Sequence, residues 1–136
     1  MTNNKCYFLG DIHGVFKPIK KLYNQGLIEK DSILVLLGDA GLNYFLDERD
    51  IALKEKLSEL PLTYFIIRGN HEERPSLLMQ RQPHDWKLMK FFDNITYVEK
   101  RFPNIHYALD SVAEYNINGH STLVIPGAYS IDKFYR

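Results

Sequence analysis

The chain has 136 residues, 45% of them hydrophobic, and its 17 Lys and Arg balance its 17 Asp and Glu. This length predicts one domain over residues 1–136, the hydrophobic content excludes a disordered chain, and the absence of a basic block gives no indication of a nucleic-acid surface. Cys6 is the single cysteine, so an internal disulfide is impossible. Because no long apolar run follows the polar start, we expect a cytoplasmic protein without a leader peptide or membrane span.

Three units, each a strand followed by a loop and a helix, are predicted in the first half of the chain. The run 33–37 contains no polar residue, which is typical of a strand buried on both faces of a parallel sheet. The apolar spacing predicts, in chain order, a strand at 6–9, a helix between Val15 and Gly26, a strand at 33–37, a helix between Asp47 and Pro61, and a strand at 62–67.

The second half has a different pattern, with short alternating runs in place of strand and helix units. Asn118-Gly119 lies between two such runs and is a strong signal for a tight hairpin turn. The pattern predicts a loop at 80–86, strands at 95–98 and 105–109, a hairpin of 114–117 with 120–125, and a helix that begins at Ser130.

Immediately after each of the three predicted strands, the sequence has polar side chains that can bind metals. Asp11 and His13 follow the first, Asp39 the second, and Asn70 with His71 the third. Because the carboxyl ends of parallel strands meet at one edge of a sheet, we expect these side chains to converge there. Carboxylate oxygen and imidazole nitrogen together suit zinc, manganese or iron. Taken alone, the first segment also fits a turn in which Asp11 caps a helix.

The three loops together resemble the motifs of the calcineurin-like metallophosphoesterase family. The matching segments are Gly-Asp-Ile-His-Gly at 10–14, Gly-Asp at 38–39 and Gly-Asn-His-Glu at 69–72. The segment 127–133 is similar to a stretch in a small bacterial and phage branch of that family. The resemblance implies an α/β fold in which a β-sandwich is flanked by helices.

The resemblance also implies the role of each motif residue. Asp11 and His13 would bind one metal, Asp39 would bridge two, and Asn70 would bind the second. His71 would act as the acid on the leaving-group side. The implied reaction is hydrolysis of a phosphomonoester or phosphodiester by metal-activated water, with manganese, zinc, iron or nickel as the divalent metal.

This sequence departs from the family near its end. The family completes its site with three further histidines close to the C-terminus, two of them in a Gly-His-x-His loop that this chain lacks. His120 is explained by the hairpin turn, His106 lies in a strand pattern, and His84 is a candidate for a substrate loop. We therefore expect an N-terminal part of the family's domain, incomplete at the C-terminus, that holds one metal or fewer.

Two alternatives to an active enzyme follow from that expectation. The chain could be an inactive fragment that binds a metal or a protein, or a half-enzyme completed by another chain. Association with a second copy of itself is a further expectation. An uncovered sheet face would favour such association. The candidate residues for this face are Tyr107, Leu109, Leu123 and Ile125.

The segment after the second motif also bears on the substrate. Members of the family that act on phosphoproteins carry an aspartate and an arginine there, and this chain has neither in Ala-Gly-Leu-Asn at 40–43. That difference argues against a phosphoprotein substrate. Arg68 is expected to pair with a carboxylate.

Overall fold

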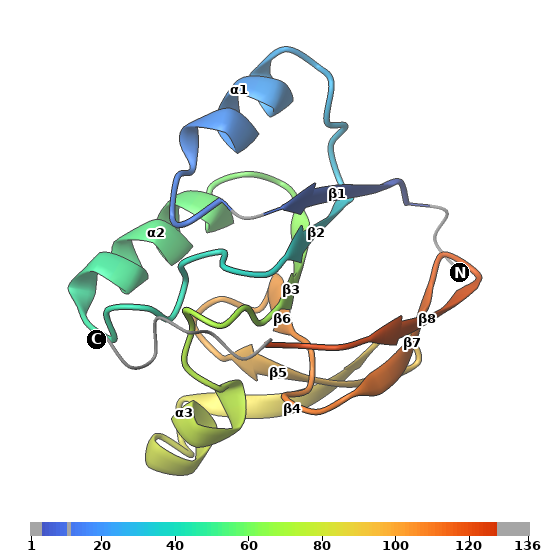
Figure 1. Ribbon diagram of the computed structural model, residues 1–136. Coiled ribbons are helices and arrows are strands. Elements are labelled where there is room, and N and C mark those ends of the chain that lie inside the picture. Colours follow the sequence, from blue (N-terminus) through green and yellow to red (C-terminus); the bar gives the residue numbers. More distant parts are fainter. Residues whose placement is uncertain (1–3, 11, 128–136) are drawn as a thin grey trace.

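The structure is a computed structural model that describes residues 4–10 and 12–127 (Figure 1). No helix in this part of the chain has the length and apolar character needed to cross a membrane. The elements are, in chain order, β1 (Cys6–Gly10), α1 (Lys17–Asn24), β2 (Ile33–Leu37), α2 (Glu48–Ser58), β3 (Thr63–Ile67), α3 (Pro75–Arg81), β4 (Trp86–Phe91), β5 (Asn94–Glu99), β6 (Ile105–Tyr107), β7 (Ala113–Ile117) and β8 (His120–Val124).

Six strands form one mixed sheet in the order β1-β2-β3-β6-β5-β4. The pairs β1–β2, β2–β3 and β3–β6 are parallel, and β5 and β4 add to the sheet in antiparallel orientation. Gly10 pairs with Leu37, and Leu37 pairs with Ile67, so the first three strands end at the same level. The predicted parallel arrangement of these strands is confirmed, and their following loops leave one edge of the sheet together.

The helices cover one face of this sheet, and the β7–β8 hairpin covers part of the other (Figure 1). Leu34 and Leu36 of β2 join the helix-side core with Ile19 of α1 and Leu57 of α2. The alternate residues of β2 face the hairpin. These packed layers explain why residues 33–36 contain no polar side chain, whereas Leu37 at the end of the strand is 49% exposed.

The hairpin forms the second, two-stranded sheet of the structure. Its turn places Asn118 at φ 51° and Gly119 at φ 87°. Positive φ at both central residues is the geometry that favours Asn-Gly in a two-residue hairpin. Tyr115 and Val124 pack on Phe65 of β3. The predicted hairpin is confirmed, and the two sheets with flanking helices agree with the expected α/β sandwich.

Helix α2 begins as the sequence predicts, because the side chain of Asp47 accepts a hydrogen bond from the Arg49 amide. A polar contact also fixes its inner face. Lys54 lies 2.7 Å from Glu99 of β5, and both side chains are almost completely buried. Removing one partner of such a pair would leave an uncompensated buried charge. This pair therefore ties α2 to the far half of the sheet.

Some boundaries differ from the sequence prediction. Residues 80–86 are not a continuous loop, because Gln80 and Arg81 end α3 and Trp86 begins β4. The third of the later strands, β6, stops at Tyr107 and does not continue to Leu109. Helix α3 and strand β4 are short, and their apolar residues do not follow a clear helical or alternating spacing. The helix expected to begin at Ser130 lies outside the described residues.

The prediction of an uncovered sheet face is wrong for one of its residues, Tyr107. Tyr107 is 2% exposed and lies on the helix side, with its ring centroid 5.4 Å from that of Trp86. Leu109 is half-buried, whereas Leu123 and Ile125 are exposed. Tyr107 faces the helices because the register of β6 sets its orientation, and the sequence alone does not show that register.

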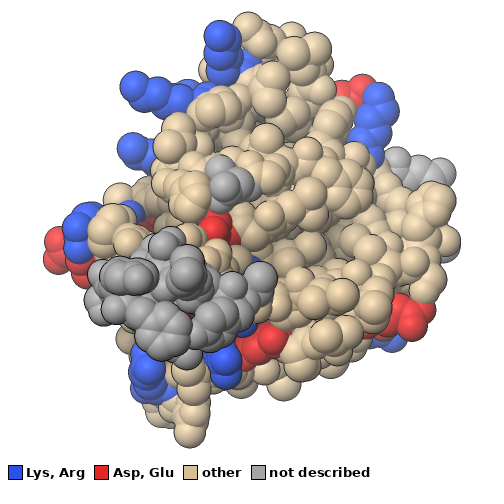
Figure 2. Space-filling model, viewed as in Figure 1, with Lys and Arg blue, Asp and Glu red and all other residues tan. Residues whose placement is uncertain are grey.

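Exposed apolar side chains line a cleft between the first two strands and the hairpin. Its volume is about 560 Å³. We call it the apolar cleft and define it by Phe8, Leu37, Leu123 and Ile125. Figure 2 shows a hollowed surface in this region, with charged side chains mostly at the periphery of the view. Association through this surface with another copy or another chain stays a prediction.

His106 is a strand residue, as the sequence predicts, and it is buried in the sheet. Its ring stacks on Phe91 with centroids 4.1 Å apart, and its Nδ1 lies 3.2 Å from the hydroxyl of Thr96. Burial, with a smaller contribution from the charge of Lys87, lowers the pKa of His106 from 6.5 to about 4. The folded protein therefore keeps this imidazole neutral at pH values where the unfolded chain protonates it.

This difference predicts a pH-dependent loss of stability that His106→Phe reduces. Between pH 6.5 and 4 the unfolded chain binds a proton that the folded chain does not, so stability falls as the pH is lowered. At pH 5 the loss amounts to about 2 kcal/mol. Phenylalanine keeps a ring against Phe91 but has no proton to gain. Urea unfolding at pH 5 and 7 measures the effect, and an equal pH dependence in both proteins would contradict it.

Candidate active site at the carboxyl edge of the sheet

The loop after β2 holds the loop after β1 through its backbone. The His13 amide donates to the carbonyl oxygen of Asp39, and the Gly14 amide donates to that of Ala40, each at 2.8 Å. His13 and Asp39 have φ values of 46° and 45°, a left-handed conformation that is uncommon for residues with a side chain. Such residues persist where surrounding contacts determine them, which is frequent at functional sites.

The same loop is joined to the loop after β3 through two carboxylates. Oδ1 of Asp39 accepts a hydrogen bond from the His71 amide at 2.9 Å. Oε1 of Glu72 accepts from the amides of Ala40, at 2.9 Å, and Gly69, at 3.4 Å. The loop after β2 is therefore fixed on both sides, and Asp39 takes part in both connections.

Two glycines allow the three loops to approach one another this closely. A Cβ atom at Gly41, which has φ +82°, would lie 2.5 Å from the amide nitrogen of Gly14. A Cβ atom at Gly69 would overlap the side chain and backbone nitrogen of Asp39. Glycine is thus required at the points where the second loop contacts its neighbours.

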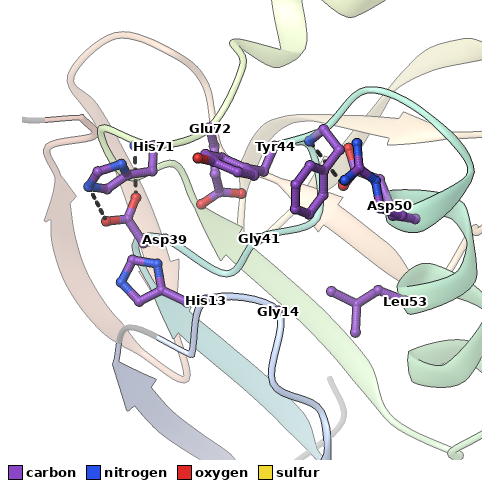
Figure 3. A pocket seen from close by; sticks show the side chains of 11 residues that line it. His13, Gly14, Asp39, Gly41, Tyr44, Asp50, Leu53, His71 and Glu72 are labelled. Carbon is purple, nitrogen blue, oxygen red and sulfur yellow. Dashed lines mark hydrogen bonds and ion pairs between the residues drawn. The ribbon is translucent and has the colours of Figure 1, made fainter. Parts of the chain in front are cut away.

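His13, Asp39 and His71 come together as the sequence predicts (Figure 3). Nε2 of His71 lies 3.8 Å from Oδ2 of Asp39, and the imidazole centroids of His13 and His71 are 5.7 Å apart. The side chains of His71 and Asp39 are 19% and 14% exposed. These groups are therefore held by the protein yet accessible from the cavity beside them.

Glu72 lies below this cluster and is buried. Burial raises its pKa to about 7, and the charge of Asp39 acts in the same direction. The hydrogen bonds from Ala40 and Gly69 and the charge of Arg68 oppose that rise. Glu72 thus combines a structural role between two loops with an acidity unlike that of a surface glutamate.

Asp39 lines two different cavities, one on each side of its loop. The first has a volume of about 350 Å³ and also exposes His13 and His71. The second is the apolar cleft, where Asp39 lies with Asn70 and Arg68. Asn70 is exposed and does not line the first cavity. The predicted residues therefore form two groups that share Asp39.

The donors present fit a divalent cation in their chemistry. Imidazole and carboxylate groups from His13 and Asp39 meet at one edge of the sheet, with the Asn70 amide on the other side of Asp39. Within residues 4–10 and 12–127, however, no three His, Cys, Asp or Glu side chains form a metal-binding group. Asp11, the fourth predicted ligand, lies outside the described residues.

The other histidines are elsewhere in the molecule. His120 begins β8 at the hairpin turn, and the exposed His84 lies between α3 and β4. His106 is buried among strands. None of the three appears among the described residues that line the two cavities.

The guanidinium of Arg68 donates to the carbonyl oxygen of Gly69 at 3.3 Å and lies close enough to Glu72 to lower its pKa.

The sequence analysis missed several residues that line the first cavity. Tyr44, Phe45, Arg49 and Asp50 lie between the second motif and the body of α2. The sequence signal for these lining residues is the apolar run 44–46, which immediately precedes the cap Asp47. In the structure these side chains are exposed and do not contribute to the core. Leu53 of α2 lines the same cavity.

Comparison with known families gives one match that extends over almost the whole chain. The sequence model of the calcineurin-like phosphoesterase family matches residues 5–135. No solved structure gave a significant match to the chain.

Gly69→Ala tests the close approach of the loops. The new methyl group would overlap Asp39, so either this carboxylate or the third loop must move. We expect a loss of about 1–3 kcal/mol in the free energy of unfolding, as for other overpacked sites. Gly10→Ala is the matched control, because its Cβ would meet no described atom within 4 Å. Urea unfolding measures both variants, and equal stabilities would show that the loops are not fixed at Gly69.

Proposed function

Because the chain belongs to the calcineurin-like phosphoesterase family, we propose that it is a metal-dependent hydrolase of a phosphomonoester or phosphodiester. The observation that carries this proposal is the position of Asp39. Its backbone holds His13, its carboxylate accepts from His71, and its side chain lines both cavities. A residue placed in this way is suited to serve two ligand groups at once.

In this proposal, Asp11 and His13 hold one metal, Asp39 is shared, and Asn70 belongs to the second position. The roles of Asp11 and Asn70 rest on the family resemblance and on their positions after β1 and β3. A divalent metal would supply neutralisation of the phosphoryl oxygens and a nucleophile from water at neutral pH.

His71 is proposed as the acid that protonates the departing oxygen. Its ring lies at the same cavity as Asp39, and its backbone is fixed by the bond from its amide to Oδ1. An imidazole held next to the reacting group can transfer a proton without a large movement. His13 lines the same cavity, and its ring contacts that of His71 edge to face, with centroids 5.7 Å apart.

A second candidate is a module that binds a metal or a partner without turnover. It is favoured by the exposed apolar side chains of the apolar cleft, which lie next to Asn70. The apolar cleft would then bind another chain, which would complete the site next to Asn70. Metal binding and catalysis, measured separately, distinguish the two candidates.

Titration with manganese is expected to detect one weakly bound ion in the full chain. His13→Ala should weaken binding further, because it removes an imidazole from the cluster around Asp39. His120→Ala is the matched control, since His120 lies at the hairpin turn and lines neither cavity. Isothermal titration calorimetry measures the stoichiometry. Two tightly bound ions, or equal losses in the two variants, would contradict this assignment.

Hydrolysis of p-nitrophenyl phosphate and bis-p-nitrophenyl phosphate with added manganese tests the catalytic roles. Asp39→Asn should abolish turnover, although the new side chain can still accept from the His71 amide. His71→Ala should lose about 10²–10⁴-fold on alkyl phosphoesters and much less on nitrophenyl esters, whose leaving group needs no proton. Activity that survives in Asp39→Asn would contradict the metal role, and equal losses on both ester types would contradict the acid.

A further inference from the structure

Three consecutive large apolar residues are exposed beside the proposed active site. Tyr44, Phe45 and Leu46 have exposed fractions of 45%, 47% and 50%. Contiguous exposed apolar side chains mark binding sites more often than single ones do. Tyr44 and Phe45 line the cavity that contains Asp39 and His71, whereas Leu46 is not part of its described lining.

Hydrogen bonds to a buried carboxylate hold this exposed loop in one conformation. Asp50 is 3% exposed, and its two carboxylate oxygens accept from the amides of Phe45 at 3.2 Å and Leu46 at 2.7 Å. Leu46 has φ 60°, an unfavourable conformation for a leucine. On the other side, the buried Asn43 accepts from the Glu73 amide at 2.9 Å. The loop is therefore preorganised, and its apolar side chains are not exposed by chance.

The side chains of this loop build an aromatic wall in which the two ring planes stand 82° apart. The rings of Tyr44 and Phe45 meet edge to face, with centroids 4.8 Å apart. The guanidinium carbon of Arg49 lies 3.7 Å from the centroid of Phe45. Arg49 is itself held by Asp47, with Nη2 and Oδ2 2.7 Å apart. Aromatic rings and guanidinium planes are the groups on which proteins stack nucleobases.

The wall and the polar cluster belong to one continuous cavity. Figure 3 shows His13, Asp39 and His71 at one end, Tyr44 near Glu72 in the middle, and Asp50 with Leu53 at the other end. A cavity of about 350 Å³ is within the range of small-molecule sites, roughly 300–1,000 Å³. One end thus contains the groups proposed to bind a metal and a phosphoryl group, and the other suits an apolar aromatic group.

We propose that the substrate carries a flat aromatic group of nucleobase type, which packs against Tyr44, Phe45 and Arg49 while its phosphoryl group lies at Asp39 and His71. This inference rests on the proposed phosphoesterase function. The positive charge of Arg49 is already balanced by Asp47, and the Asp50 carboxylate is occupied by two amides. The wall therefore offers stacking surface in place of a second strong anion site.

A pair of substrates with identical leaving groups isolates the aromatic contribution. Adenosine 5′-monophosphate and ribose 5-phosphate both release a primary ribose hydroxyl, and one of them lacks the base. Their phosphate methyl esters form the corresponding pair for a phosphodiesterase. We expect kcat/KM to be about 10-fold or more higher for the substrate with the base, as stacking on an aromatic side chain would give. Equal values within each pair would overturn the inference.

Phe45→Ala should remove most of this preference. Leu46→Ala is the matched control, because it deletes an equally exposed apolar side chain from the same loop but outside the cavity lining. Thermal unfolding of both variants verifies that the loop change has not unfolded the domain. Retention of the preference in Phe45→Ala, or an equal loss in Leu46→Ala, would overturn the assignment of the wall.

Binding without turnover separates this inference from the proposed function. Saturation-transfer NMR with adenosine 5′-monophosphate and magnesium should show transfer to the base protons in the wild type and in Leu46→Ala, but much less in Phe45→Ala. If neither ester pair is hydrolysed and this pattern is still observed, the aromatic site stands while the phosphoesterase function fails. Absence of transfer to the base in the wild type would overturn the inference whether or not phosphoesters are cleaved.

Discussion

The conformation of Asp39 is the constraint on which the rest of the site depends. Its left-handed backbone turns the chain directly after β2, so that its carbonyl oxygen reaches the first loop and its carboxylate reaches the third. Neither contact could form if the chain continued in the direction of the strand. Glu72 supports the same turn by accepting two amides, one from Ala40 in the loop of Asp39 and one from Gly69 in its own loop. Three loops from distant parts of the sequence thereby become one rigid surface.

Much of this arrangement could be predicted because its signals are local. The unbroken apolar run 33–37 indicates a strand that packs on both faces. Asn118-Gly119 indicates a hairpin turn, and both of its residues have positive φ. The convergence of His13, Asp39 and His71 followed from their common position after parallel strands. In each case, a few neighbouring residues contain the physical reason for the structure.

The features that were missed depend on contacts between distant segments. Tyr107 was placed on the wrong face because its orientation follows from the register of β6 against β3, which no neighbouring residue determines. Strand β4 has lysines within an edge strand, so its pattern does not alternate clearly. The loop 44–46 is exposed beside the cavity because Asp50 accepts hydrogen bonds from two of its amides, and the sequence does not show this contact.

The order of strand pairing has a consequence for how the protein folds. In the hairpins, Phe91 pairs with Asn94 and Ile117 with His120, and β-hairpins of this kind form within about 1–10 μs. In the parallel half, Cys6 pairs with Ile33 and Ile33 with Thr63, so long segments must lose chain entropy before any contact compensates for it. An early folding species can therefore contain both hairpins while the edge that unites the three loops does not yet exist. The proposed active site therefore forms only when the parallel strands, which pair most slowly, have come together.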